Sequence, residues 1–565
     1  MTSGLHIAIL VADMYIETIT SQKKYITHYL RESYRENGKV KHKTIANISH
    51  CSPEEIEALR LALKHKHSLV DIAPLDDVLS LHQGPSVGAL LVLREIAERV
   101  GITESLGSTR DGKLALWQIL SRVIDQGSRL SATRLASSHG VCDILGLDSF
   151  NEEHLYKNLD WTCSRQALIE DRLFRTLHGD NLPELFLYDV TSSYLEGTHN
   201  ELAAFGYNRD RKNGKPQIVI GLLSDQFGFP LSIEVFEGNT GDTGTFANQI
   251  KKVSERFGGG VVTLVGDRGM IKSRQMTDLQ EHGFHGITAI TKAQIETLMN
   301  KGVVQLEFFE DNLVEIESDG HRYILRRNSE RAKEMKVTRE NKRVVLEKAI
   351  EKGNAYLETH PKAKVTTIFK RVTGKAQRLK MKAWITITTC GRKIGYEVQA
   401  DGLQEAERFD GCYVLKTDVP MGKMSKEEIH SRYKDLALIE QTFRTCKTGH
   451  LELRPIHVRL GDHTRAHVFI VMLAFRLVQE LRKCWWDVDV TVEEGIAELS
   501  RISAVEIRIK GKTTGWKFPQ PSELGQQLLE KAGVKLPKGM PSKGIKVTSR
   551  KKPKDWRKPA SGKSL

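Results

Sequence analysis

Alternating strand and helix patterns between residues 184 and 291 constrain the fold more than any other part of the chain. Three short apolar segments come first, and two further apolar segments each follow a helical pattern. The predicted order is strands 185–190, 217–223 and 230–236, helix 245–257, strand 261–265, helix 273–282 and strand 285–291. This order predicts an α/β fold in which a mixed sheet is layered with helices.

The remaining sequence divides around this predicted core. Turn signals, changes of periodicity and charge runs predict the boundaries. The predicted regions are 1–66, a small N-terminal α+β unit; 84–180, a helical region; 184–291, the first part of the core; 292–408, an insertion; 409–485, the second part of the core; 486–534, a C-terminal region; and 535–565, a basic flexible tail. The insertion is highly charged, with alternating strand-like segments such as 322–327 and 383–388 and a basic helical run over about 330–353.

Local signals support this division near the N-terminus. Asn37-Gly38 favours a hairpin between two strand-like segments. Ser52-Pro53, followed by two acids, predicts the start of a helix. The helical region 84–180 carries Arg122 and Arg129, so it is either a candidate DNA-end-binding domain or plain structural support.

Composition points to a polyanionic partner inside the cell. The 565 residues carry a net charge of +14, which favours nucleic acid first and an anionic membrane second. Seven scattered cysteines without a Cys-x-x-Cys pair predict a reducing cytoplasm. The apolar start, 5–12, is short and reads as a strand, and no apolar run reaches the ~18–20 residues that span a bilayer. We therefore expect a cytoplasmic protein without membrane contact.

A charged stripe marks the helix predicted over 433–447. Tyr433, Glu440 and Lys447 are spaced seven residues apart, so they lie along one face, with Arg444 beside them. A carboxylate flanked by a phenol and two cations can hold a metal ion and a phosphodiester together. The alternative is an amphipathic helix with a solvated charged face.

Two aspartates in the predicted core complete a candidate metal site. Asp189 lies inside the first apolar strand, where an acid is costly unless it is paired or bound to metal. Asp267 directly follows the strand 261–265. Each has an alternative role, Asp189 as a hydrogen-bonded core acid and Asp267 as a helix cap. Together with Glu440 they form an Asp, Asp, Glu set that suits Mg²⁺, or Mn²⁺ as a substitute.

Several motifs occur in the order found in bacterial insertion-sequence transposases of the DDE class. The chain resembles the branch whose last acidic motif reads Tyr-x2-Arg-x3-Glu-x6-Lys, and the resemblance covers residues 150–480 best. The matching blocks are Tyr188–Tyr194, Gly206–Asp210, Gln217–Leu222, Gly238–Asp242, Gly266–Met270, Tyr433–Lys447, Leu453–His457 and Arg465–His467.

This resemblance implies a ribonuclease-H-like core, a mostly β insertion and cut-and-paste DNA transposition. It also implies that Asp189, Asp267 and Glu440 bind the catalytic metal ions and that Tyr433 and Lys447 contact DNA phosphates. The motif's arginine position is Leu436 here. We expect Arg444 or Lys434 to supply the missing cation.

The resemblance also implies double-stranded DNA partners, namely the terminal inverted repeats of the element and the target DNA, bound by a homodimer. Basic residues of the insertion could follow the DNA backbone, with a solvated surface as the alternative. They are Arg326, Arg327, Arg331, Lys333 and Lys336. Trp384 and Tyr323 could stack on a displaced base, although burial in the insertion is the favoured interpretation.

Two other functions compete with an active transposase. One is a non-catalytic DNA-binding protein derived from a transposase, which the intact Asp, Asp, Glu set disfavours. The other is a ribonuclease-H-like nuclease that does not join strands, which the insertion and the Tyr- and Lys-flanked Glu440 disfavour.

Overall fold

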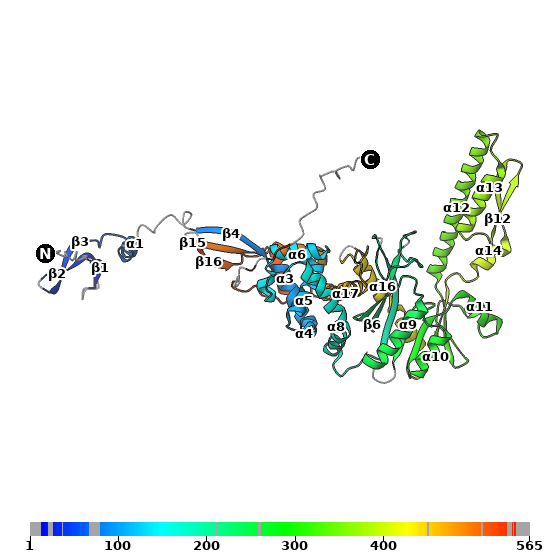
Figure 1. Cartoon of the computed structure of the whole chain (residues 1–565), viewed down its shortest axis with the longest axis horizontal. Coiled ribbons are helices and arrows are strands. Elements are labelled where there is room, and N and C mark those ends of the chain that lie inside the picture. The colour runs from blue at the N-terminus through cyan, green and yellow to red at the C-terminus, as the bar shows by residue number, and fades with distance from the viewer. Residues whose placement is uncertain are drawn as a thin grey trace, which may run out of the picture. The chain divides into compact units, whose positions relative to one another are not determined.

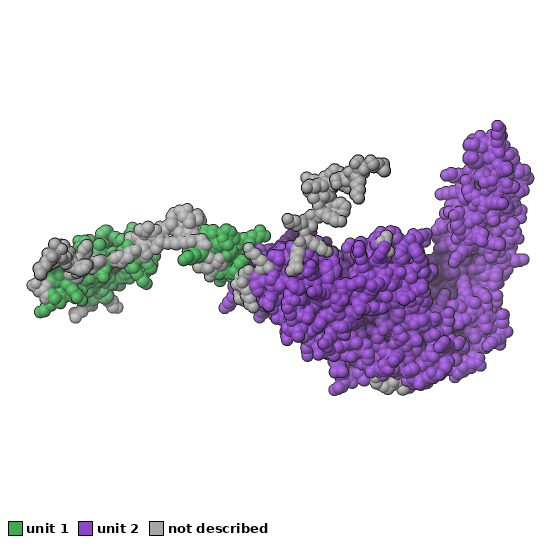
Figure 2. Space-filling model, in the orientation of Figure 1, with its two compact units in different colours: residues 1–83, 505–517 green, residues 84–504, 518–565 purple. Residues whose placement is uncertain are grey.

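The computed structural model describes two compact units. One unit contains residues 1–83 and 505–517, and the other contains residues 84–504 and 518–565 (Figure 2). The residues described are 13–20, 26–36, 38–66, 79–197, 199–210, 212–257, 262–448, 451–509, 512–539, 545 and 547–549. The strand predicted over 5–12 and most of the predicted flexible tail lie outside them.

The first unit is built around a small antiparallel sheet. Its strand order is β1-β2-β3. The strands are β1 (Asp13–Thr20), β2 (Ile26–Glu36) and β3 (Lys39–Asn47), followed by helix α1 (Pro53–Lys64). Ser52 and Glu55 form a reciprocal capping box at the start of α1, as the sequence predicts. The predicted hairpin is present, with Glu36 paired to Lys39.

A second three-stranded sheet has the order β16-β15-β4. Its strands are β4 (Leu79–Ser86), β15 (Ser503–Ile509) and β16 (Lys512–Lys517). The strands β4 and β15 cross the boundary between the two units.

The second unit begins with a layer of helices. They are α3 (Gly88–Arg99), α4 (Ile102–Leu106), α5 (Arg110–Ile124), α6 (Arg129–Ser138), α7 (Val141–Leu145) and α8 (Glu152–His178). Helix α17 (Gly461–Cys484) packs against α5 and α8 and is buried along most of its length, including Arg476. Helices α18 (Val492–Ser500) and α19 (Glu523–Lys531) follow. None of the described helices is long and apolar enough to cross a bilayer.

A mixed eight-stranded sheet forms the centre of this unit (Figure 1). Its order is β10-β11-β14-β9-β8-β5-β6-β7, in which β8 and β9 run parallel to β5 and the other neighbouring pairs are antiparallel. The strands are β5 (Leu185–Tyr194), β6 (Gln217–Asp225), β7 (Pro230–Phe236), β8 (Thr263–Gly266), β9 (His285–Ala289), β10 (Val314–Ser318), β11 (His321–Arg327) and β14 (Cys412–Thr417). The predicted mixed α/β architecture is confirmed.

Helices cover both faces of this sheet. On one face, Val219 and Leu223 of β6 belong to a core cluster with Phe246 and Ile250. The helices of this face are α9 (Asp242–Lys252), the π-helical turn η2 (Val253–Phe257) and α10 (Ser273–Glu281). On the other face, Ile220 lines a small cavity with residues of α17 and of α16 (Leu436–Lys447). Successive side chains of β6 point to opposite faces of the sheet, so this strand contributes to the hydrophobic core on each face.

The prediction that the insertion 292–408 is mostly β was wrong. Most of its residues in regular secondary structure are helical, and its strands β10 and β11 extend the large sheet. The other elements are α11 (Lys292–Asn300), the 3₁₀ turn η3 (Leu306–Phe308), α12 (Ser329–Thr359), α13 (Val365–Arg378), β12 (Ile385–Cys390), β13 (Lys393–Val398) and α14 (Ala400–Glu407).

The mostly β expectation came from the family resemblance, whereas the helical run predicted over about 330–353 is present as α12. Helix α13 adds to the helical content, because Ile368, Val372 and Ala376 recur every four residues and form one buried face. That face packs against α12, and Trp384 belongs to the same cluster. Trp384 and Tyr323 are both buried, which agrees with the favoured interpretation of these two rings.

Candidate active site

The pleat and register of the sheet bring the two aspartates together. Tyr188 and Val190 belong to the core cluster under α9, so Asp189 between them points to the opposite face of β5. Strands β5 and β8 are parallel, and Tyr188 pairs with Gly266. The residue that follows each of these two in the sequence is an aspartate, so Asp189 and Asp267 are neighbours across the two strands.

Glu440 reaches the same face from α16. This helix packs against β5 and is anchored by Leu436, Ile439 and Phe443, which are all buried. The helix predicted over 433–447 is divided at Asp435, where α15 (Lys426–Lys434) ends and α16 begins. Tyr433 therefore lies on α15 rather than on the helix of Glu440.

A cavity of about 570 Å³ unites these residues. Its lining residues include Asp189, Asp267, Glu440, Arg444 and Lys447, all of which the sequence had singled out. The further charged residues of the lining are Arg209, Asp210, Asp242, Arg268 and Arg454. The cavity therefore combines a carboxylate cluster with a surrounding set of cations.

Asp189 is the most perturbed acid in this cavity. Burial raises its pKa to about 7, although the backbone N–H of Val190 donates a hydrogen bond to the carboxylate. The nearby charges of Asp267 and Glu440 raise this pKa further, and Arg209 lowers it. The three carboxylates are thus close enough to influence one another electrostatically.

Tyr433 holds Asp267 from outside the cavity lining. Its phenol donates a hydrogen bond of 3.1 Å to Asp267 Oδ1. Burial and the adjacent carboxylate raise the pKa of Tyr433. The phenol therefore stays protonated and orients one oxygen of Asp267, leaving the other oxygen available.

Lys447 is engaged inside the protein. Its ammonium lies 3.1 Å from Asp210 Oδ1, and Arg454 lies 2.7 Å from the same oxygen. Burial lowers the pKa of Lys447, while the Asp210 carboxylate opposes this shift. Sequence reasoning missed Asp210 as the partner of Lys447, because the two residues lie far apart in the chain.

Two glycines explain why separate sequence blocks meet here. A Cβ atom on Gly206 would lie 2.2 Å from the carbonyl oxygen of Gly238, and one on Gly238 would lie 1.9 Å from that of Gln217. Only glycine permits these backbone contacts. Close packing of the two blocks brings Arg209 next to Asp242, with which it forms an ion pair.

Leu436, at the position of the motif arginine, and the two cations expected to compensate for it lie in different surroundings. Leu436 is buried at the start of α16 and contributes to the anchoring of this helix. Arg444, two turns later, lines the cavity. Lys434, the other cation expected to compensate, is not among the described lining residues.

The chemistry of the donor set suits a hard divalent cation. Asp189, Asp267 and Glu440 provide carboxylate oxygens, which Mg²⁺ and Mn²⁺ prefer. In the described part of the chain, no three His, Cys, Asp or Glu side chains are already arranged as a metal cage. The side chains of the three acids would therefore have to turn toward a bound ion.

Comparison with protein families decides the classification. Residues 16–73 match the family described as IS1634 family transposase, N-terminal domain. Residues 180–477, more than half of the chain, match the Transposase DDE domain. The chain belongs to the DDE transposases. This confirms the resemblance to insertion-sequence transposases, a family that generally uses divalent metal ions.

No curated protein matches this DDE transposase. Among solved structures, it is similar to a piggyBac transposase in a synaptic complex with hairpin DNA. The identity is 10% and the TM-score is 0.36, and the match covers 74% of this chain and 82% of the other.

Proposed function

We propose that this protein catalyses cut-and-paste transposition of an insertion sequence. Strand cleavage at the ends of the element would be followed by transfer of the ends to target DNA. The observation that carries the proposal is one cavity lined by Asp189, Asp267 and Glu440 together with four arginines and a lysine. Carboxylates for metal and cations for phosphate are what phosphoryl transfer requires.

The proposed catalytic core is ribonuclease-H-like. Within the large sheet, the order β7-β6-β5-β8-β9 places three consecutive antiparallel strands beside two parallel ones. Asp189 on the central strand β5 and Asp267 at the end of β8 occupy its middle. Their place in this topology supports their assignment as catalytic acids.

Asp189, Asp267 and Glu440 would hold Mg²⁺, with Mn²⁺ as a substitute. The bound ion would polarise the phosphodiester and lower the pKa of an attacking water or 3′-hydroxyl. Burial disfavours the charged form of Asp189, and a nearby cation would stabilise that form. Tyr433 would fix the orientation of Asp267 throughout the reaction.

The cations of the cavity would bind the phosphates of the DNA strand. Arg444 lines the cavity directly and is our candidate for the role of the missing motif arginine. Lys447 and Arg454 share Asp210, so a DNA phosphate would have to compete with this carboxylate. The Tyr433 hydroxyl donates its hydrogen bond to Asp267, so Tyr433 would contact a phosphate only through the side of its ring that faces away from Asp267.

The proposed partners are the terminal inverted repeats and the target DNA, held by a homodimer in the cytoplasm. Basic residues of the insertion could add contacts to the DNA backbone. Arg331 and Lys333 are exposed on α12, but each forms an ion pair with a glutamate of the same helix. Such exposed pairs contribute little and can open toward a phosphate.

The test uses purified full-length protein, Mg²⁺ and DNA that carries the sequences flanking the coding region. Wild type is expected to cleave at the repeats and to join the ends to a target duplex. Asp189→Asn and Glu440→Gln should do neither, while Asp180→Asn, an exposed acid outside the cavity, serves as the control. Cleavage without joining would favour the nuclease, and equal cleavage by all variants would refute the site.

The role of Arg444 needs its own variant. Arg444→Ala should retain the fold, because the side chain is exposed, and should lower cleavage without changing Mg²⁺ binding. Unchanged cleavage would exclude Arg444 as the replacement for the motif arginine.

A further inference from the structure

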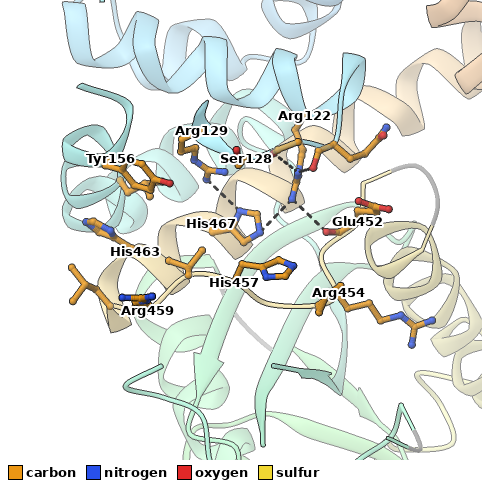
Figure 3. A pocket seen from close by; sticks show the side chains of 16 residues that line it. Arg122, Ser128, Arg129, Tyr156, Glu452, Arg454, His457, Arg459, His463 and His467 are labelled. Carbon is orange, nitrogen blue, oxygen red and sulfur yellow. Dashed lines mark hydrogen bonds between the residues drawn. The ribbon is translucent and has the colours of Figure 1, made fainter. Parts of the chain in front are cut away.

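A second cavity, of about 730 Å³, lies beside the proposed active site and has a strongly cationic lining (Figure 3). It is enclosed by α5, α6, α8, the start of α17 and the loop 452–460. Arg454 lines both this cavity and the one that contains Glu440. The cationic residues and histidines used below are Arg122, Arg129, His457, Arg459, His463 and His467.

Three of these side chains form a buried cluster in which both arginines point toward one histidine (Figure 3). Arg122 Nη2 lies 3.4 Å from His467 Nε2, and Arg129 Nη2 lies 3.3 Å from His467 Nδ1. Arg122 also donates to backbone carbonyls, including that of Gly127 at 3.0 Å. Arg129 comes from the first turn of α6, so two helices and α17 contribute to the cluster.

The cluster cannot satisfy its own hydrogen bonds. A guanidinium only donates, and a neutral imidazole accepts at one nitrogen and donates from the other. Burial and the two arginines lower the pKa of His467, so the ring is neutral. At least one of the two arginines therefore faces an N–H group. The Nε atoms of Arg122 and Arg129 are also buried without a hydrogen-bond partner.

The cluster also lacks a paired negative charge. Neither Arg122 nor Arg129 forms an ion pair with a carboxylate among the described residues, and Glu452 is the one acid of the cavity lining. Burial lowers the pKa of Arg129 to about 9, and repulsion from Arg122 adds to the effect. Glu452 and Asp125 act on Arg122 through space, and burial still lowers the pKa of Arg122 to about 10. A buried cation without a directly paired carboxylate, such as Arg129, destabilises a fold unless a ligand completes it.

We propose that this cavity binds a backbone phosphate of the DNA strand that enters the catalytic cavity. A phosphate supplies acceptor oxygens for several guanidinium N–H groups at once and neutralises the buried charge. Arg459 and His457 lie exposed at the rim, where the neighbouring part of the strand would pass. The inference rests on the proposed function, because that function brings DNA to the shared residue Arg454.

The cavity also involves two sequence blocks of which the catalytic cavity uses only Arg454. The block Leu453–His457 supplies Arg454, Pro455 and His457 to the lining, and the block Arg465–His467 supplies the central histidine. Arg122 and Arg129 belong to the helical region for which the sequence allowed either DNA binding or structural support. This site favours DNA binding, through a phosphate contact that positions the strand without reading its sequence.

The experiment measures binding of a duplex of arbitrary sequence to full-length protein in EDTA, over a series of salt concentrations. Each phosphate contact contributes about 0.9 to the slope of log K against log salt. Arg459→Ala should reduce the slope by about this amount and weaken binding. Arg175→Ala is the matched control, because Arg175 is exposed on α8 about 28 Å along the helix from Tyr156.

A buried variant separates a ligand-binding role from a structural one. Arg129→Met removes an uncompensated charge, so the melting temperature should rise or stay unchanged while DNA binding weakens. Inorganic phosphate should raise the melting temperature of wild type and leave that of Arg129→Met unaffected. An equal response of both proteins to phosphate would overturn the proposal.

The outcomes also distinguish this inference from the proposed function. Wild-type binding and slope in both Arg459→Ala and Arg129→Met would refute the phosphate site, whatever the catalytic activity. If Arg129→Met does not fold, Arg459→Ala decides the matter alone. Failure of the proposed function would instead appear as an absence of Mg²⁺-dependent cleavage by wild type.

Discussion

Removal of the Asp210 carboxylate is expected to expose the energetic cost of the buried Lys447. The side chains of Asp210 and Lys447 are 3% and 9% exposed, and their ion pair spans 3.1 Å. Arg454 binds the same carboxylate but its side chain is 30% exposed. In Asp210→Ala, Arg454 can turn to water, whereas Lys447 keeps its buried position without a counter-ion.

The size of the effect follows from this difference. Breaking a buried pair by removing one partner costs about 3–5 kcal/mol, because the remaining charge stays buried. Arg454 is more exposed than Lys447 and can regain water, so its loss of a partner costs less. We therefore expect the unpaired charge of Lys447 to account for most of the destabilisation. Asp210→Ala should lower the free energy of unfolding by about 3–5 kcal/mol. Asp210→Ala combined with Lys447→Met should recover most of the loss, because the double variant buries no unpaired charge.

Native-state hydrogen exchange at the amides of β5 and β6 is the appropriate assay, because it reports the opening free energy of the sheet in a chain with several units. A DNA phosphate could also replace the lost carboxylate, so duplex DNA should stabilise Asp210→Ala more than wild type. A loss below about 1 kcal/mol, or a double variant no more stable than the single one, would refute this reasoning.

Three further predictions follow from the site. Tyr433→Phe removes one hydrogen bond to Asp267, so single-turnover cleavage should fall about five- to tenfold, and an unchanged rate would exclude the orienting role. Leu436→Arg restores the motif arginine but buries a charge, so it should lower the free energy of unfolding in urea by about 2–4 kcal/mol. Cleavage should not increase, and a higher cleavage rate would contradict this prediction. The folded-state pKa of Asp189 is raised from 3.8 to about 7, so its stabilisation of metal-free protein is complete below pH 3.8 and lost as the pH rises through 7. Between pH 3.8 and 7 the melting temperature of wild type should therefore fall relative to that of Asp189→Asn. If the melting temperatures of the two proteins change in parallel with pH, the raised pKa of Asp189 is refuted.

Much of the core could be predicted because its elements depend on local pattern. The strand containing Asp189 is a short apolar segment with turn signals at its ends, and the same holds for β6 and β7. The mostly β character expected for the insertion came from the family resemblance, and the helical period of α13 was not used to correct it. The break between α15 and α16 at Asp435 was not predicted, since no proline or glycine marks it.

The site shows the same division between local and long-range information. Glu440 and the two aspartates were identified through motifs, and the parallel register of β5 and β8 explains why the aspartates meet. Asp210 could not be assigned to Lys447 from spacing, because their contact depends on the tertiary fold. The cluster of Arg122, Arg129 and His467 was equally hidden, since it joins helices separated by the whole core.

Binding of Mn²⁺ to the full-length protein tests the central claim most directly. Titration followed by electron paramagnetic resonance should show binding by wild type and by the control Asp180→Asn. Each of Asp189→Asn, Asp267→Asn and Glu440→Gln should weaken binding at least about tenfold, because each replaces a charged carboxylate ligand by a neutral amide. Wild-type affinity in all three variants would show that these carboxylates do not form a metal site.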